Sequence, residues 1–197
     1  MGLAMLGFGV GGPLGTFAGL WHLLNHALAK SLGFFAVGNI FRRYRTRQIH
    51  EVQGMAKVQP ITAIAFLAGG LALVGMPPFS LFNSELLVIT SLAQMTFQFD
   101  SFHLGRFLTI TVSHEIRSLG IIMIIVLLAV AVFGGFIYRL TGMVWGTPPA
   151  GVRQGEAWHI GQLPLALSVL ALVWMGFYLP AQVEPLLQRA TDVVIGR

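Results

Sequence analysis

The stretch that decides the fold is IIMIIVLLAVAVFGGFIY, residues 121–138, which contains no charged side chain. As a helix rising ~1.5 Å per residue, it comes close to the ~30 Å thickness of a membrane's hydrocarbon core. Two further runs have the same character: ITAIAFLAGGLALVGM at 61–76 and LPLALSVLALVWMGFYLPA at 163–181. Each run predicts a transmembrane helix, because only a helix satisfies its own backbone hydrogen bonds in lipid.

The composition of the 197-residue chain agrees, with 55% hydrophobic and 10% charged residues. Soluble domains carry about 25% charged residues, so a soluble globular protein is excluded. The chain has no cysteine, which leaves no disulfide framework and no thiolate metal site. The net charge is +5, and four arginines lie in FRRYRTRQIH, residues 41–50. We interpret this segment as a loop facing lipid headgroups, and nucleic acid is not an expected partner.

The apolar runs and the breaks between them predict an all-α integral membrane protein with a single membrane domain over residues 1–197. The prolines at 77–78 end one helix, since proline disfavours helical backbone before it. We expect about five transmembrane helices, with a partial helix before them and an amphipathic helix after them. The expected spans are 2–11 (partial), 15–40, 60–76, 79–97, 119–140 and 163–181, with an interfacial connector at 98–118 and the amphipathic tail at 183–196.

The segment LWHLLNHALAK, residues 20–30, places two histidines and a lysine at intervals of four among apolar residues. On a helix, His22, His26 and Lys30 drift about 80° around the axis while rising roughly 12 Å, so they form one polar stripe. We interpret the stripe as a proton path, because an imidazole one turn from a desolvated ammonium helps that ammonium release its proton. Three alternatives remain open: Lys30 snorkels from near a helix end, the histidines are ordinary buried residues, or they form a zinc pair that needs further ligands.

Glu85 is a second ionisable residue inside an apolar segment. At ~1.5 Å per residue it lies about 10 Å beyond Pro78, close to mid-depth. A charge there costs on the order of 2.5–3.5 kcal/mol and marks an ion path. We interpret Glu85 as a carboxylate that loads and unloads protons as a lysine partner moves, with a static ion pair to another helix as the alternative.

Several amide and hydroxyl side chains lie near these charges in the sequence. They are candidates for holding the water molecules along which protons hop, and ordinary hydrogen bonds between helices are the alternative role. These residues are Asn25, Asn39, Asn83 and Ser84.

Two ordered motifs, HLLNHALAKSLGFFAVGNI at 22–40 and GMPPFSLFNSELL at 75–87, are similar to a known membrane family. They resemble the antiporter-like, proton-translocating membrane subunits of respiratory complex I, of energy-converting hydrogenases with formate hydrogenlyase, and of multisubunit sodium/proton antiporters. Within the second motif, the segment PPFSLFNSE at 77–85 is most similar to the hydrogenase-4 membrane component. The resemblance implies the second half of a bundle of about fourteen helices made of two inverted repeats.

The resemblance also implies roles for four residues. His22, His26 and Lys30 correspond to the stripe of the family's second half-channel, and Glu85 to the residue that faces the proton exit. The first half-channel has no counterpart here, so the chain is either a naturally split subunit or a truncated fragment. Expected partners are other membrane subunits, including a chain or segment supplying that half, peripheral redox subunits, and the lipid bilayer. The expected location is the inner membrane of a bacterium or the plasma membrane of an archaeon.

The predicted function is proton translocation within a redox-driven complex of the hydrogenase-4, formate hydrogenlyase or NADH:quinone oxidoreductase type. The chain itself is expected to hold no cofactor and no metal and to do no redox chemistry, because it has neither a nucleotide fingerprint nor cysteine ligands for a cluster. Two alternatives remain: a sodium/proton antiporter subunit, and a structural scaffold whose half-channel is inert.

With the helices 60–76 and 79–97 between them, the loops at 41–59 and 98–118 are expected to share one side of the membrane with the tail, and the loop at 141–162 is expected to lie on the other side. The first side is richer in lysine and arginine, which makes it cytoplasmic by the positive-inside rule. The family resemblance places that side outside, and we favour the orientation that it implies.

Overall fold

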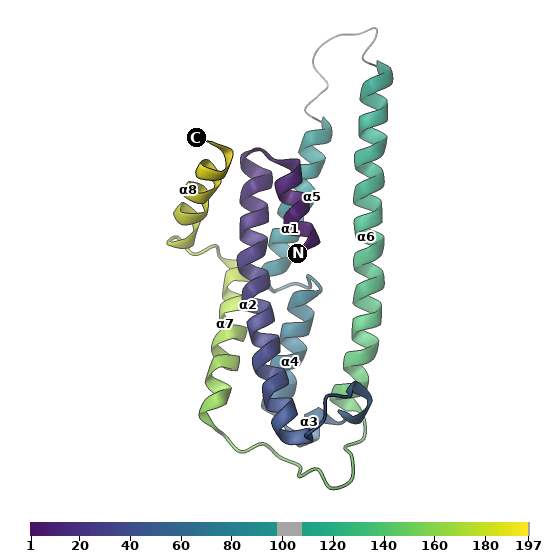
Figure 1. Cartoon of the computed structure of the whole chain (residues 1–197), viewed down its shortest axis with the longest axis vertical. Coiled ribbons are helices and arrows are strands. Elements are labelled where there is room, and N and C mark those ends of the chain that lie inside the picture. Colours follow the sequence, from purple (N-terminus) through teal and green to yellow (C-terminus); the bar gives the residue numbers. More distant parts are fainter. Residues whose placement is uncertain (98–107, 197) are drawn as a thin grey trace. The chain divides into compact units, whose positions relative to one another are not determined.

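The structure is a computed structural model that describes residues 1–97 and 108–196, with side chains for 1–94 and 119–196. Within these ranges every regular element is a helix (Figure 1). Short 3₁₀ turns lie at Ile49–Glu51 and Ile160–Gln162. The helices are α1 (Gly2–Val10), α2 (Gly12–Tyr44), α3 (Met55–Val58), α4 (Pro60–Leu73), α5 (Ser80–Phe97), α6 (Leu108–Trp145), α7 (Leu163–Phe177) and α8 (Val183–Ile195).

The observed bounds differ most from the expected ones at α6. The sequence predicts an interfacial connector at 98–118, but residues 108–118 are the first turns of α6. Residues 98–107 lie outside the described part of the chain. The β-branched residues of 108–118 are therefore part of a helix, although such residues have a slightly lower helix propensity.

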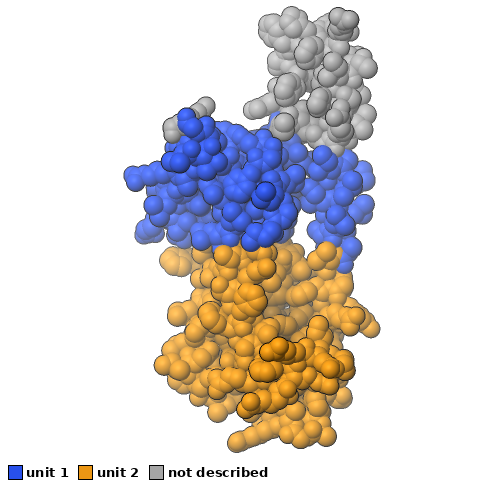
Figure 2. All heavy atoms as spheres, viewed as in Figure 1, with its two compact units in different colours: residues 1–24, 82–131, 179–197 blue, residues 25–81, 132–178 orange. Residues whose placement is uncertain are grey.

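Where the sequence predicts a single domain, the contacts gather in two compact units, which Figure 2 colours separately. Unit 1 holds α1, the beginning of α2, most of α5, the first part of α6, and α8. Unit 2 holds the remainder of α2, then α3, α4, the last part of α6, and α7.

Unit 1 is built on a close approach between α1 and the start of α2. A Cβ on Gly7 would lie 2.9 Å from the carbonyl oxygen of Gly15 and 3.1 Å from the Cα of Gly19. The turn between the helices uses Gly11 and Gly12, whose φ angles are 70° and 65°. Small residues at such contacts are typical of membrane helices, where packing rather than hydrophobic burial drives association.

Unit 2 has its core where α2, α4 and α7 meet. Alanine and leucine supply most of this core, which lets the helix backbones approach each other closely. Gly69 of α4 faces Leu32 of α2, and a Cβ on Gly69 would lie 3.2 Å from the leucine Cγ. The buried residues are Ala29, Leu32, Ala36, Ala65, Ala68, Ala72, Phe79, Leu81, Leu165 and Leu172.

Two helices of the described residues are long and apolar enough to cross a membrane, Leu119–Trp145 and Ile160–Phe177. The segment Pro60–Leu73 is apolar but shorter. Its 14 residues span only about 21 Å, less than the ~30 Å of a hydrocarbon core. The described residues are therefore all-helical, and two of the about five expected spans are long and apolar enough to cross a membrane.

The shortness of α4 corrects the expected sidedness of two loops. The segment 41–59 and the segment between α6 and α7 lie together at one end of unit 2, because Gly155 donates its N–H to the carbonyl oxygen of Lys57 at 3.0 Å. The sequence places these segments on opposite sides. That expectation is wrong because it counts 60–76 as a complete crossing, and the α4 helix inside it is too short for one.

Candidate functional site

Unit 1 contains a buried polar pair between α2 and α5. The Nδ1 of His22 lies 3.0 Å from the Oγ of Ser84, and both side chains are buried. Which atom donates the hydrogen bond depends on the histidine tautomer. His22 is therefore held in one orientation beside α5, at the residue that immediately precedes Glu85.

Unit 2 contains a second buried polar pair. The Nδ2 of Asn25 donates to the carbonyl oxygen of Ser80, the first residue of α5, at 3.3 Å. Both side chains are completely buried. The Oδ1 of Asn25 and the Oγ of Ser80 have no hydrogen-bond partner among the described residues. Buried polar atoms of this kind are usually satisfied by ordered water. Ser80 is missing from the sequence-based set, although it lies one helical turn from Ser84.

The stripe itself runs from the interior to the surface along α2. His22 is 2% exposed, His26 is half-buried and Lys30 is exposed. The expectation that Lys30 is buried is therefore wrong for this chain on its own. The reason is the drift of about 80° along the stripe, which turns the lysine away from the packed face.

Lys30 shares its exposed face of α2 with large apolar side chains. Phe34 is 71% exposed, and Val37 and Phe41 are also exposed. Their spacing of three or four residues places them on one stripe. The opposite face, which includes Ala29 and Leu32, packs into the core of unit 2. Within this chain, Lys30 thus sits on an apolar surface that nothing described covers.

Glu85 is half-buried on α5, next to Ser84. Within the described residues it makes no hydrogen bond or ion pair, so the static lysine pair left open by the sequence is not formed there. Asn83, on the same turn, is half-buried. Asn39 lies elsewhere, at the far end of α2 beside the arginines of residues 42–45, where it lines a cavity treated below.

A zinc site needs at least three convergent ligands. No cluster of three or more His, Cys, Asp or Glu side chains suited to a metal occurs in the described part of the chain. The pair His22 and His26 therefore lacks a third ligand from these residues.

These observations define a helical membrane protein with polar groups placed inside it. The chain belongs to the NADH:quinone oxidoreductase/Mrp antiporter transmembrane family, whose profile matches residues 1–111. This match confirms the resemblance carried by the two sequence motifs.

Individual relatives agree with the family. The chain is 42% identical over 91 residues to the hydrogenase-4 component F homolog of Methylacidiphilum infernorum, covering 46% of this chain and 19% of that protein. It is 29% identical over 181 residues to formate hydrogenlyase subunit 3 of Escherichia coli, covering 86% and 27%. A chain of the membrane-bound sulfane sulfur reductase, an archaeal respiratory membrane complex, matches with a TM-score of 0.67 and 25% identity over 94% of this chain and 33% of that one.

The chain therefore spans between a fifth and a third of the length of these relatives. It is an antiporter-like membrane subunit of a multi-pass membrane family, and its relatives are components of multi-subunit membrane complexes.

Proposed function

We propose that the chain forms a proton half-channel within a redox-driven membrane complex of the hydrogenase-4, formate hydrogenlyase or NADH:quinone oxidoreductase type. The observation that supports this most directly is the buried hydrogen bond between His22 and Ser84, one residue from Glu85. A buried imidazole held beside a carboxylate-bearing helix is suited to passing protons. Membership of the family supports the same function.

In this proposal, Lys30 and His26 deliver protons to His22, and Glu85 releases them towards one face of the membrane. Histidine can take up a proton on one ring nitrogen and release it from the other, so it relays without moving far. Within unit 2, the Oδ1 of Asn25 and the Oγ of Ser80 have no hydrogen-bond partner among the described residues and would each anchor a water molecule. Asn83 is a further candidate for holding such water.

The proposal requires a partner at the exposed face of α2. A lysine in an apolar surface of a membrane helix is costly in lipid and is expected to face protein or a water-filled cavity. We therefore place the chain or segment that supplies the first half-channel against Lys30, Phe34 and Phe41. We further propose that peripheral redox subunits bind the complex. We place the complex in a bacterial inner membrane or an archaeal plasma membrane.

The decisive experiment measures proton uptake into sealed vesicles that contain the assembled complex. Glu85→Gln and Lys30→Ala are compared with wild type at matched expression, and assembly is checked by native gel. The controls are Glu184→Gln, on the tail helix α8, and Lys57→Ala, on the short helix α3 before α4. We expect uptake to be lost in the first pair and kept in the controls. Unchanged uptake in Glu85→Gln and Lys30→Ala would make the chain a scaffold.

A sodium/proton antiporter is the second candidate, because the family includes Mrp antiporter subunits. In that case Glu85 would alternate between a proton and a sodium ion. Repeating the uptake measurement with sodium replaced by choline separates the two functions. Uptake that needs sodium would favour the antiporter, and uptake that does not would favour the redox-driven pump.

A further inference from the structure

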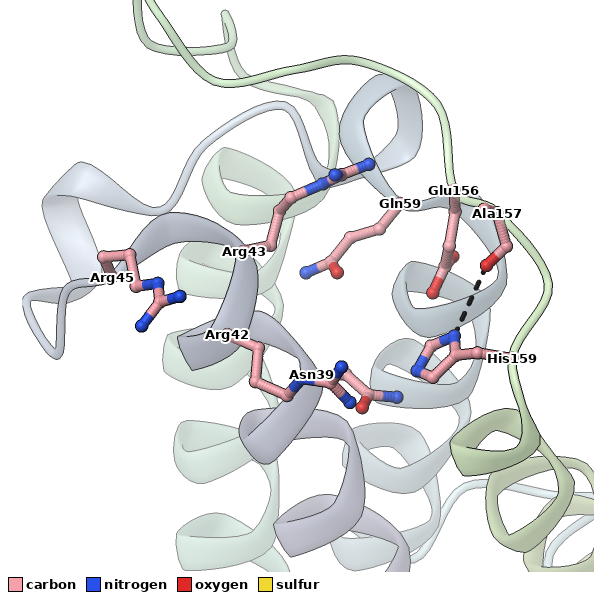
Figure 3. Close-up of a pocket in the computed structure, with 8 residues that line it drawn as sticks. All are labelled: Asn39, Arg42, Arg43, Arg45, Gln59, Glu156, Ala157 and His159. Carbon is pink, nitrogen blue, oxygen red and sulfur yellow. Dashed lines mark hydrogen bonds between the residues drawn. The ribbon is translucent and has the colours of Figure 1, made fainter.

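Unit 2 contains a cavity of about 370 Å³ at the end where α2 terminates (Figure 3). The last turns of α2 contribute to its wall, together with the residue before α4 and the segment that precedes α7. Its volume falls in the range of small-molecule sites. The lining residues are Asn39, Arg42, Arg43, Arg45, Gln59, Glu156, Ala157 and His159.

The side chains of Arg43 and Glu156 form hydrogen bonds with backbone groups around this cavity. Arg43 donates to the carbonyl oxygens of Val58, at 3.3 Å, and Gly155, which joins the two loop segments. Glu156 accepts hydrogen bonds from the backbone N–H groups of Ile61 and Thr62 at 2.9 and 3.0 Å. The partial positive charge at the N-terminus of α4 therefore compensates the negative charge of Glu156.

The cavity is also lined by two guanidinium groups that have no partner among the described residues. The side chains of Arg42 and Arg45 both line the cavity, and neither makes a hydrogen bond or ion pair with any described residue. Each guanidinium carries several N–H donors in a planar fork that matches the oxygens of a phosphate. The cavity thus has an excess of positive charge and of donors.

The amide donors of two further side chains are also unpaired. Gln59 is 3% exposed, and its Nε2 has no hydrogen-bond partner within the described residues. The Nδ2 of Asn39 is buried and unpaired in the same way. In Figure 3 the Gln59 side chain extends between Arg43 and Arg42. An unpaired buried donor is costly, so a ligand that brings acceptor oxygens would satisfy both amides.

The backbone conformation of Arg45 is a second indication that its side chain has a role at the cavity. Arg45 has a φ of 58° and donates its N–H to the carbonyl oxygen of Phe41 at 2.9 Å, which ends α2. Glycine is the residue that adopts this left-handed helix end without steric cost. An arginine at this position keeps a guanidinium at the cavity at the expense of local backbone strain.

The surroundings indicate a lipid as the source of the anion. Ile61, two residues after Gln59, is 40% exposed, and Trp158, between Ala157 and His159, is 71% exposed. Exposed tryptophan is typical of the headgroup level of a membrane, and basic pockets between membrane helices bind anionic headgroups. Polar donors and exposed apolar side chains therefore adjoin each other at one end of unit 2.

We propose that this cavity binds the phosphate group of an anionic phospholipid. Arg42 and Arg45 provide the charge, and Gln59 and Asn39 donate hydrogen bonds to the phosphate oxygens. The acyl chains lie along the apolar ends of the neighbouring helices. The lining contains neither Lys30, a stripe histidine nor Glu85, and Asn39 is the one lining residue that the sequence suggested as a water-holding candidate.

The test titrates the purified full chain in detergent with phosphatidylglycerol, phosphatidylcholine or inorganic phosphate, and reads bound ligand by native mass spectrometry. The variants are Arg42→Gln and Arg45→Gly, the second chosen because glycine suits the backbone. Arg47→Gln is the matched control, because it removes the same charge from the same segment, residues 42–47. Arg47 stacks on Phe41 with 5.4 Å to the ring centroid and does not line the cavity. Circular dichroism confirms that each variant folds.

We expect phosphatidylglycerol to bind more tightly than phosphatidylcholine. Loss of a charge-assisted hydrogen bond in Arg42→Gln or Arg45→Gly is expected to weaken phosphatidylglycerol binding about ten-fold. Arg47→Gln is expected to weaken it by less than about two-fold. Equal weakening in all three variants, or no preference for phosphatidylglycerol, would overturn the proposal in favour of diffuse attraction. Inorganic phosphate that displaces phosphatidylglycerol at equal concentration would overturn the lipid as the source.

Discussion

The Nδ1 of His22 on α2 and the Oγ of Ser84 on α5 lie 3.0 Å apart in a buried position. Because Ser84 immediately precedes Glu85, this contact ties the orientation of the imidazole to the helix that carries the carboxylate. A hydroxyl that can donate or accept is compatible with either histidine tautomer, so the contact survives a change of protonation.

Ser84→Ala removes the hydroxyl that orients His22 and is expected to slow proton uptake by the assembled complex without abolishing it. A net hydrogen-bond contribution of about 1 kcal/mol corresponds to a decrease of roughly five-fold. The control is Ser91→Ala, since Ser91 is a buried serine of the same helix that donates only to the local carbonyl oxygen of Val88 at 2.7 Å. Equal uptake in the two variants would show that the contact with His22 is structural.

Glu156→Ala is expected to destabilise the protein, because Glu156 binds the first free N–H groups of α4 and the hydroxyl of Thr62 at 2.5 Å. Loss of a helix cap costs about 1–2 kcal/mol. Glu184→Ala serves as the control, with an expected cost of at most about 0.5 kcal/mol, since within the described residues the Glu184 side chain accepts an exposed hydrogen bond from Gln188 of its own helix. Unfolding in detergent with increasing denaturant measures both, and equal midpoints would contradict the capping role.

Gly176→Ala is expected to disturb the packing of α7 against the interruption between α4 and α5. A Cβ on Gly176 would overlap the carbonyl oxygen of Pro78. Because the overlapping atom belongs to the backbone, the clash can be relieved only if the backbone moves. Overpacking of this kind costs about 1–3 kcal/mol. Gly135→Ala on α6 is the matched control, because a Cβ there meets nothing within 4 Å. Thermal unfolding of the two variants checks the prediction, and similar midpoints would count against the close approach.

Tyr44→Phe tests the end of α2 at alkaline pH. The Tyr44 hydroxyl donates to the carbonyl oxygen of Gln53 at 2.8 Å, and burial raises the pKa of Tyr44 from 10.0 to about 12. Because the folded-state pKa is raised, the neutral phenol contributes stability below pH 10, and that stability is lost as the pH rises through about 12.

The measurement is a titration of phenolate absorbance together with unfolding midpoints. The absorbance missing in Tyr44→Phe is expected to come from the part of the titration near pH 12. The loss of stability at alkaline pH is expected to be smaller in the variant than in wild type. Absorbance missing from the region near pH 10 instead would show that Tyr44 is not shielded from water.

The local pattern of the sequence was enough to predict the membrane class and the existence of the main helices. Charge-free runs such as 121–138 determine this, because a helix satisfies its hydrogen bonds within its own segment. The same locality explains the stripe, since the spacing of His22, His26 and Lys30 follows from helix geometry alone. The family resemblance rested on motifs that are equally local, and the family match confirms it.

Only the tertiary structure decided which face of each helix is packed and which segments meet. Lys30 is exposed because α2 packs through Ala29 and Leu32, a choice that depends on where α4 and α7 lie. Glu156 caps a helix that begins 96 positions earlier in the chain, at Pro60, and the buried Nε2 of Gln59 has no partner in the part of the chain that the structure describes. Contacts between such distant segments leave no periodic signal, because they follow from the packing of whole helices rather than from the spacing within one.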